Sequence, residues 1–102
     1  MNTIAGSKVR AVAVACDGGM GSSVLVAGQL GSALAPFGVT VRAVAINDLP
    51  VQADVVVCQE ALLGRVRAAV PGTVVLGFRL FLGDPVLDRL AVAVREGADL
   101  VG

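Results

Sequence analysis

The chain has 102 residues, of which 56% are hydrophobic and 16% are charged, and its formal net charge is zero. This length suits one domain, residues 1–102, and the composition excludes a disordered chain. The balanced charge argues against binding to nucleic acid or to an anionic membrane surface, and the absence of histidine excludes imidazole bases and histidine-ligated metals.

The first expected unit is a strand, a loop and a helix. Residues 9–15 form a short valine-rich run of strand length that ends at Cys16. A glycine-rich loop follows, and Ser22 or Ser23 is expected to cap a helix that stops near Pro36. This order is typical of an α/β protein.

The uncharged stretch 18–41 raises the question of a membrane span. Glycine, serine, glutamine and proline residues interrupt it, whereas a spanning helix needs about 20 predominantly apolar residues. The N-terminus also lacks the basic, apolar and small-residue pattern of a secretory signal. We therefore expect a cytoplasmic protein with no direct membrane insertion.

The remaining elements alternate in the same way. They are strands over 39–46 and 54–58, a helix over 60–70, a strand over 73–78, and a helix from Asp84-Pro85 to about Gly97. Continuous apolar strands that alternate with helices predict a three-layer α/β/α domain with a parallel sheet. In such a sheet a ligand binds beyond the carboxyl ends of the strands, and Cys16 lies at one of those ends.

The loop after the first strand is the candidate site. Its glycines let successive backbone N–H groups turn inward, and the following helix N-terminus adds partial positive charge. This cradle suits a phosphoryl group and favours a thiolate at Cys16, with Asp17 pointing outward or bonding to loop amides. The expected phosphate-binding residues are Asp17, Gly18, Gly19, Met20, Gly21, Ser22 and Ser23.

Another interpretation treats Cys16 as a small buried residue before a tight turn. A third compares the loop with that of tyrosine phosphatases, which place an arginine six positions after the cysteine. Ser22 stands at that position here, and without the arginine the loop favours holding a phosphoryl group over hydrolysing its ester. A small phosphatase or an arsenate reductase-like enzyme is the alternative from the hydrolase class.

Residues 14–23 resemble the phosphocysteine loop of mannitol-type enzyme IIB proteins of bacterial sugar phosphotransferase systems. The similarity continues through residues 45–50 and 53–57 and, more loosely, through 81–90. The resemblance implies a phosphotransferase without a cofactor or metal, and a four-stranded parallel sheet in which the expected strands take the order 2-1-3-4. A regulatory module related to enzyme IIB is a further alternative.

The resemblance also implies the partners. Cys16 would accept a phosphoryl group from a phosphohistidine of enzyme IIA and pass it to a sugar, mannitol or a related polyol, bound in the membrane-embedded enzyme IIC. The chain would thus associate with the membrane through enzyme IIC. The missing histidine fits this scheme, because the phosphohistidine belongs to the partner.

Four residues have two interpretations each. Cys58 ends a strand that the resemblance places beside the first, so it is either a core or rim residue or a partner for a reversible disulfide with Cys16. Arg79 either reaches a phosphoryl oxygen or a partner carboxylate, or it is solvated. Asp84 is either a general acid or, as we favour, a helix cap. Met20 either contacts a partner or packs within the loop.

Overall fold

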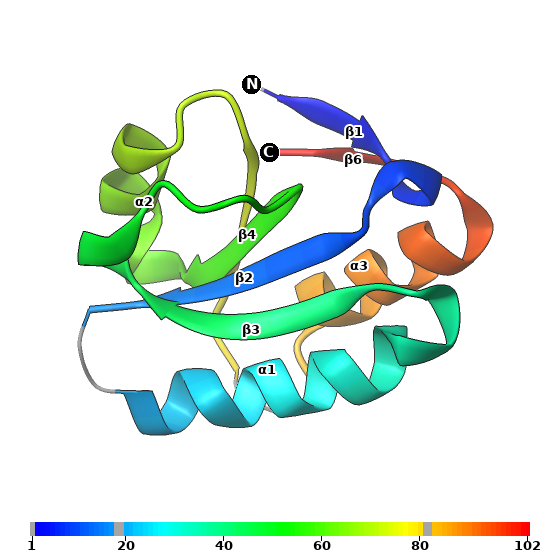
Figure 1. Ribbon diagram of the computed structural model, residues 1–102, viewed down its shortest axis with the longest axis horizontal. Coiled ribbons are helices and arrows are strands. Elements are labelled where there is room, and N and C mark those ends of the chain that lie inside the picture. Colours follow the sequence, from blue (N-terminus) through cyan, green and yellow to red (C-terminus); the bar gives the residue numbers. More distant parts are fainter. Residues whose placement is uncertain (1, 18–19, 81–82) are drawn as a thin grey trace.

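The computed structural model describes residues 2–17, 20–80 and 83–102. It contains a four-stranded parallel sheet of order β3-β2-β4-β5 and a separate two-stranded sheet (Figure 1). This order confirms the expected 2-1-3-4.

The strands are β1 (Thr3–Ala5), β2 (Ala11–Cys16), β3 (Thr40–Ala45), β4 (Val55–Gln59), β5 (Val74–Phe78) and β6 (Asp99–Val101). The helices are α1 (Met20–Leu34), α2 (Leu63–Ala69) and α3 (Pro85–Glu96), with single 3-10 turns η1 (Gly6–Lys8), η2 (Ala35–Phe37), η3 (Ile46–Asp48) and η4 (Glu60–Leu62).

Helices cover both faces of the parallel sheet, so the expected three-layer arrangement is confirmed. Side chains alternate along β2, and Val12 and Val14 face a core shared with α1 and α3, whereas Ala13 and Ala15 face a smaller core beneath α2. Both faces of the central strands are buried, which explains why they read as continuous apolar runs. Within the described residues, no helix is both long and apolar enough to cross a membrane.

The start of α1 differs from the expected one. The helix already includes Met20, so Ser22 and Ser23 lie in its first turn and neither of them is the cap. The first N–H groups of a helix lack intrahelical acceptors, so small polar residues are tolerated there as well as at the cap itself. Ser23 is only 6% exposed, which makes it a packed residue of the first turn.

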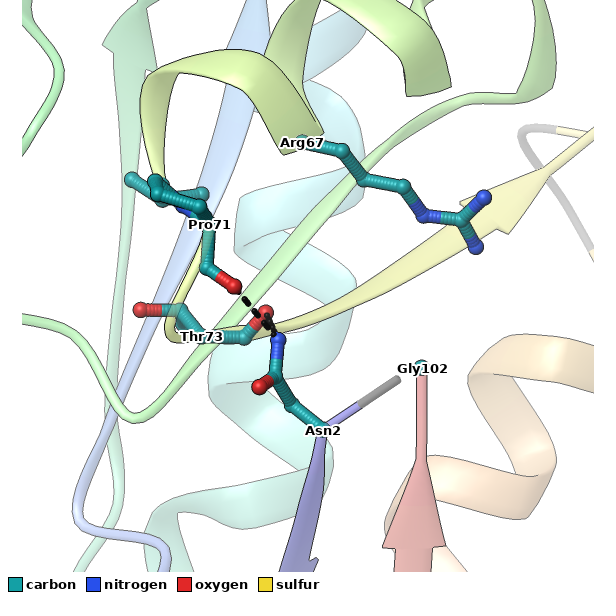
Figure 2. A pocket seen from close by; sticks show the side chains of 6 residues that line it. Asn2, Arg67, Pro71, Thr73 and Gly102 are labelled. Atoms are coloured by element: carbon teal, nitrogen blue, oxygen red, sulfur yellow. Dashed lines mark hydrogen bonds between the residues drawn. The ribbon is translucent and has the colours of Figure 1, made fainter.

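The two-stranded sheet was not foreseen from the sequence. β1 and β6 pair antiparallel, and beyond them the backbones of Asn2 and Gly102 exchange two hydrogen bonds of 3.0 and 2.8 Å. Figure 2 shows the Asn2 side chain, whose amide donates to the carbonyl oxygens of Pro71 and Thr73 at 2.9 and 3.0 Å. This terminal ribbon, formed by β1 and β6, is therefore tied to the turn that precedes β5.

Gly6 permits the close approach of the terminal ribbon to α3. Its N–H donates to the Ala98 carbonyl at 2.8 Å, and a Cβ atom added at Gly6 would overlap the carbonyl oxygen of Ala93. Backbone atoms cannot move aside as the tip of a flexible side chain can. Glycine is therefore required here because a side chain would not fit. Backbone conformation is not the reason, since Gly6 has no positive φ.

We expect Gly6→Ala to lower the free energy of unfolding by about 1–3 kcal/mol, since overpacking forces the backbone to shift. Gly28→Ala is the matched control, because nothing lies within 4 Å of a Cβ atom at that helical position. That substitution should instead raise stability by about 0.5–1 kcal/mol. Urea unfolding of both variants measures the difference, and equal stabilities would contradict this account of Gly6.

Candidate functional site

Cys16 is the last residue of β2, at the carboxyl edge of the parallel sheet. In the register of the sheet, Ala15 lies opposite Val44 of β3 and Cys58 of β4. The chain bends at Asp17 and enters α1 at Met20 (Figure 1). Gly18 and Gly19 lie outside the described residues, as do the side chains of Met20 and Ser22. The amide cradle around a phosphoryl group therefore stays a prediction.

The Cys16 side chain is buried in this structure, with 5% of the residue exposed. Its sulfur donates a hydrogen bond to the Val44 carbonyl oxygen at 3.5 Å. Alternation along β2 places it on the same face as Val12 and Val14, toward α1 and α3. The sulfur thus lies at the end of β2, on the face of the sheet that α1 and α3 cover, one residue before the bend.

Cys58 is a core residue. It is fully buried in the cluster beneath α2, beside Val56 and Val66, and burial raises the pKa of its thiol to about 11, although the nearby Arg67 charge acts in the opposite sense. Cys58 lies opposite Ala15, so it faces the other side of the sheet from Cys16. Both cysteines are present as thiols. Of the two interpretations of Cys58, the structure supports the core residue. A disulfide with Cys16 is disfavoured, because Cys58 shares its face of the sheet with Ala15 and successive positions of β2 point to opposite faces.

Asp17 points outward, as expected. Its Oδ2 lies 3.8 Å from Nη1 of Arg65, and the two side chains are 59% and 56% exposed. Arg65 is in the first turn of α2, which follows β4 and so begins at the same edge of the sheet. Sequence reasoning missed this residue, since no local motif marks it and only the fold brings it to the loop.

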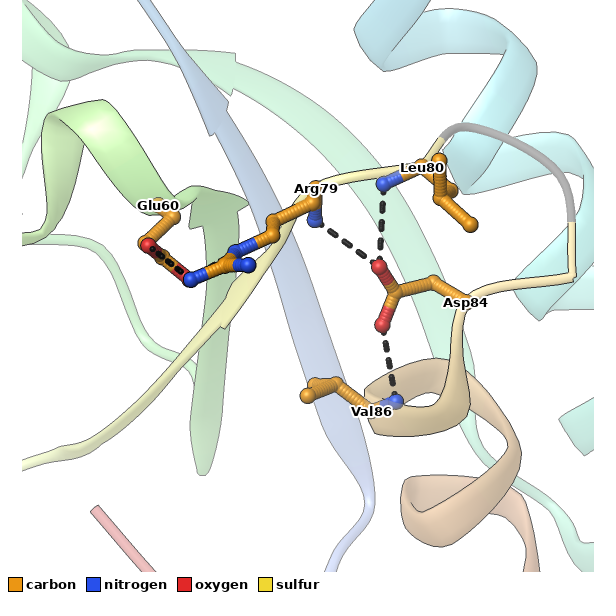
Figure 3. Close-up of polar contacts among 5 residues, drawn as sticks. All are labelled: Glu60, Arg79, Leu80, Asp84 and Val86. Atoms are coloured by element: carbon orange, nitrogen blue, oxygen red, sulfur yellow. Dashed lines mark hydrogen bonds and ion pairs between the residues drawn. The ribbon is translucent and has the colours of Figure 1, made fainter.

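Arg79 is engaged by a carboxylate of the same chain (Figure 3). Its Nε and Nη2 donate to the two carboxylate oxygens of Glu60 at 2.8 and 3.0 Å. The hydrogen bond from Arg79 holds the pKa of Glu60 below its usual range, and Glu60 in turn raises the pKa of Arg79. This bidentate pair joins the end of β4 to the end of β5. A contact of Arg79 with a phosphoryl oxygen stays a prediction.

Asp84 caps α3, which confirms the interpretation favoured from its sequence. Its Oδ1 accepts a hydrogen bond from the backbone N–H of Val86 at 2.8 Å. Its Oδ2 accepts from the backbone N–H groups of Arg79 and Leu80 at 2.8 and 2.9 Å (Figure 3). Burial opposes ionisation of this carboxyl group, but the three hydrogen bonds and the Arg79 charge outweigh it and lower its pKa. A carboxylate held in this way is poorly suited to donate a proton.

The carboxyl edge of the sheet therefore brings together a sulfur and two ion pairs. Cys16 supplies the sulfur, and the guanidinium groups of Arg65 and Arg79 lie on the side of β4 and β5. Among the described residues no group of three or more cysteine, aspartate or glutamate side chains gathers as a metal site. This arrangement suits chemistry carried by sulfur next to compensated surface charge.

We expect Asp84→Asn to lower the free energy of unfolding at pH 7 by about 1–2 kcal/mol, because an amide keeps one acceptor oxygen and turns N–H donors toward other donors. The folded-state pKa of Asp84 is depressed, so its contribution is present above the unfolded-state pKa of about 3.9 and is lost as pH falls through the folded-state value.

Urea unfolding between pH 7 and pH 3 measures this effect. The gap between wild type and Asp84→Asn should begin to narrow as the pH falls below about 4. Asp88→Asn is the control, since Asp88 is exposed on the same helix and should change stability by less than about 0.5 kcal/mol. A gap that persists unchanged at pH 3 would contradict the role assigned to the Asp84 charge.

Mild peroxide treatment of the native protein should not form a disulfide between Cys16 and Cys58. The two side chains face opposite sides of the sheet, and a disulfide needs Cβ atoms about 3.5–4.5 Å apart and pointing toward each other. Intact mass under non-reducing conditions, with and without denaturant, tests this. A cross-linked monomer formed under native conditions would show that the sheet register opens at this edge.

No family model matches the chain, but individual proteins do. It is 37% identical over 86 residues to the mannitol-specific cryptic EIICB component of the phosphotransferase system of Escherichia coli K12, covering 82% of this chain and 18% of that protein. It is 34% identical over 92 residues to the mannitol-specific EIICB component of Geobacillus stearothermophilus, covering 88% and 20%. For the component from Staphylococcus saprophyticus the values are 39% over 87 residues, covering 82% and 17%.

The chain thus spans a fifth or less of the length of these relatives. Some relatives are named as fusions with a further part, such as the mannitol-specific EIICBA component of Vibrio cholerae, to which the chain is 35% identical over 86 residues. The three EIICB components are each 34–39% identical to the chain, and each match covers 82–88% of it. The chain belongs to the mannitol-type enzyme IIB family of the bacterial sugar phosphotransferase system.

Proposed function

We propose that residues 1–102 form one enzyme IIB-like domain that carries a phosphoryl group on Cys16. The group comes from a phosphohistidine of enzyme IIA and goes to a sugar, mannitol or a related polyol, bound in enzyme IIC. The observation that carries the proposal is the position of Cys16, at the carboxyl end of the central strand β2 and directly before the bend that leads into α1. The names of the relatives, which join a B component to a C component and in one case also to an A component, support the choice of partners.

The first transfer forms a sulfur–phosphorus bond as the nitrogen–phosphorus bond of the donor breaks. The Cys16 thiol gives up its proton, its sulfur attacks phosphorus, and the bonding electron pair returns to the imidazole of the donor, which takes up a proton. In the second transfer a sugar hydroxyl oxygen attacks phosphorus, the sulfur–phosphorus bond breaks, and Cys16 leaves as a thiolate while the hydroxyl proton is released. Neither step needs a metal or an oxidant from this chain.

Deprotonation and exposure of Cys16 are linked in this proposal. The thiol donates its proton toward the Val44 carbonyl oxygen, and a thiolate has no proton to donate. Loss of the proton turns an attractive contact between sulfur and oxygen into a repulsive one. The sulfur therefore moves away from Val44 toward the bend, where an amide cradle would stabilise its charge.

The face of α1 next to the candidate site suits a protein partner. Val24 and Leu25 are 55% and 51% exposed although they are large and apolar. They line an open apolar hollow together with Gly28, Gln29 and Ser32. Exposed apolar side chains that gather beside a site are typical of docking surfaces. We assign this face to enzyme IIA or enzyme IIC, with the domain at the cytoplasmic side of the membrane.

A hydrolase is less well supported. The Asp84 carboxylate, which would be the general acid of a small phosphatase, accepts three backbone hydrogen bonds and caps a helix. Ser22 occupies the position of the phosphatase arginine. The isolated chain should therefore hydrolyse p-nitrophenyl phosphate no faster than its Cys16→Ser variant does.

Incubation with phosphoenolpyruvate, the general phosphotransferase proteins and a mannitol-type enzyme IIA tests the proposal, with the phosphate mapped by mass spectrometry. We expect one phosphate on Cys16, labile to base and to iodine. Cys16→Ser should not carry it onward, because an oxygen ester is a poorer relay, whereas Cys58→Ala should be phosphorylated like wild type. Phosphate on any other residue, or none on a folded wild-type chain, would refute the assignment.

A further inference from the structure

We propose that Arg65 is a positioning residue of the phosphoryl site. By holding Asp17, it neutralises the carboxylate that follows Cys16 in the chain, and this neutralisation permits a phosphoryl group to settle on the sulfur. The inference rests on the proposed phosphorylation of Cys16. It concerns the charge at the rim of the site, which the loop sequence by itself leaves negative.

The geometry of the edge supports this role. Nη1 of Arg65 lies 3.8 Å from Oδ2 of Asp17, and both side chains are more than half exposed. Arg65 belongs to the first turn of α2, a helix that enters from the carboxyl end of β4, the strand next to β2. The pair therefore joins the bend after β2 to α2.

Charge explains why the pair matters for phosphoryl transfer. A phosphorylated side chain carries about −1.5 to −2 at pH 7, and consecutive Cα atoms are about 3.8 Å apart, so Asp17 would repel a phosphoryl group on Cys16 at short range. A cation bound to Asp17 offsets this repulsion during the approach of the donor and in the product. The phosphoryl group on the donor protein is also negative as it approaches Cys16.

Other arginines near the sheet do not supply this charge. Arg79 is held by Glu60 in a bidentate pair at the ends of β4 and β5. Arg67 is only two positions beyond Arg65, but Figure 2 shows it over the hollow lined by Asn2, Pro71 and Gly102, at the terminal ribbon. This difference makes Arg67 a matched control on the same helix.

The test measures the initial rate of phosphate transfer from phosphorylated enzyme IIA to Cys16 at low ionic strength. We expect Arg65→Gln to slow this transfer about 3- to 10-fold, and the deficit to shrink as salt is raised, because salt screens exposed charges. Arg67→Gln should transfer at the wild-type rate. Urea unfolding should show that neither variant is substantially destabilised, since the pair of Arg65 is exposed.

A double-mutant cycle shows whether Arg65 acts through Asp17. In an Asp17→Asn background, which has no charge to neutralise, Arg65→Gln should have no further effect on the rate. If it slows transfer equally in both backgrounds, or if Arg65→Gln alone transfers like wild type, the inference is overturned while the proposed function stands. If wild type acquires no phosphate on Cys16, the proposed function itself fails, and the two failures are thus distinguishable.

Discussion

The register of β2 against its two neighbours is the constraint on which the site depends. Ala15 lies opposite Val44 on one side and Cys58 on the other, and Cys16 is the residue that follows. Because the strands are parallel, their carboxyl ends meet at one edge, and the groups after β2, β4 and β5 become neighbours. A slip of β2 by one residue would turn Cys16 toward α2, the face that Cys58 occupies.

The same register places the two cysteines in different surroundings. Cys58 shares the apolar cluster beneath α2, where burial raises its thiol pKa to about 11 and leaves it protonated at neutral pH. Cys16 is also buried, but it adjoins the bend and donates to a carbonyl at the end of the neighbouring strand. Cys58 is therefore part of the packing beneath α2, whereas Cys16 lies at the end of β2 beside the bend.

Three carboxylates at the carboxyl edge have partners within the chain. Arg65 lies beside Asp17, and Arg79 binds Glu60, while the buried Asp84 is satisfied by three backbone donors. The exposed pairs contribute little to folding, since solvent screens them. Their consequence is local: each of these two guanidinium groups lies beside a carboxylate at the edge that we assign to a phosphoryl group.

Local sequence patterns predicted the alternation of strands and helices, the parallel sheet, and the cap of α3 by Asp84, because apolar periodicity and capping residues act over a few neighbouring positions. They also marked Cys16 and its glycine-rich loop. They did not indicate the terminal ribbon, whose strands β1 and β6 have three residues each and are stable only when they pair across the whole chain.

Tertiary structure alone decided which faces Cys16 and Cys58 occupy, and which carboxylates Arg65 and Arg79 meet. These outcomes depend on register and on helix placement between residues far apart in the chain, and no local pattern encodes them.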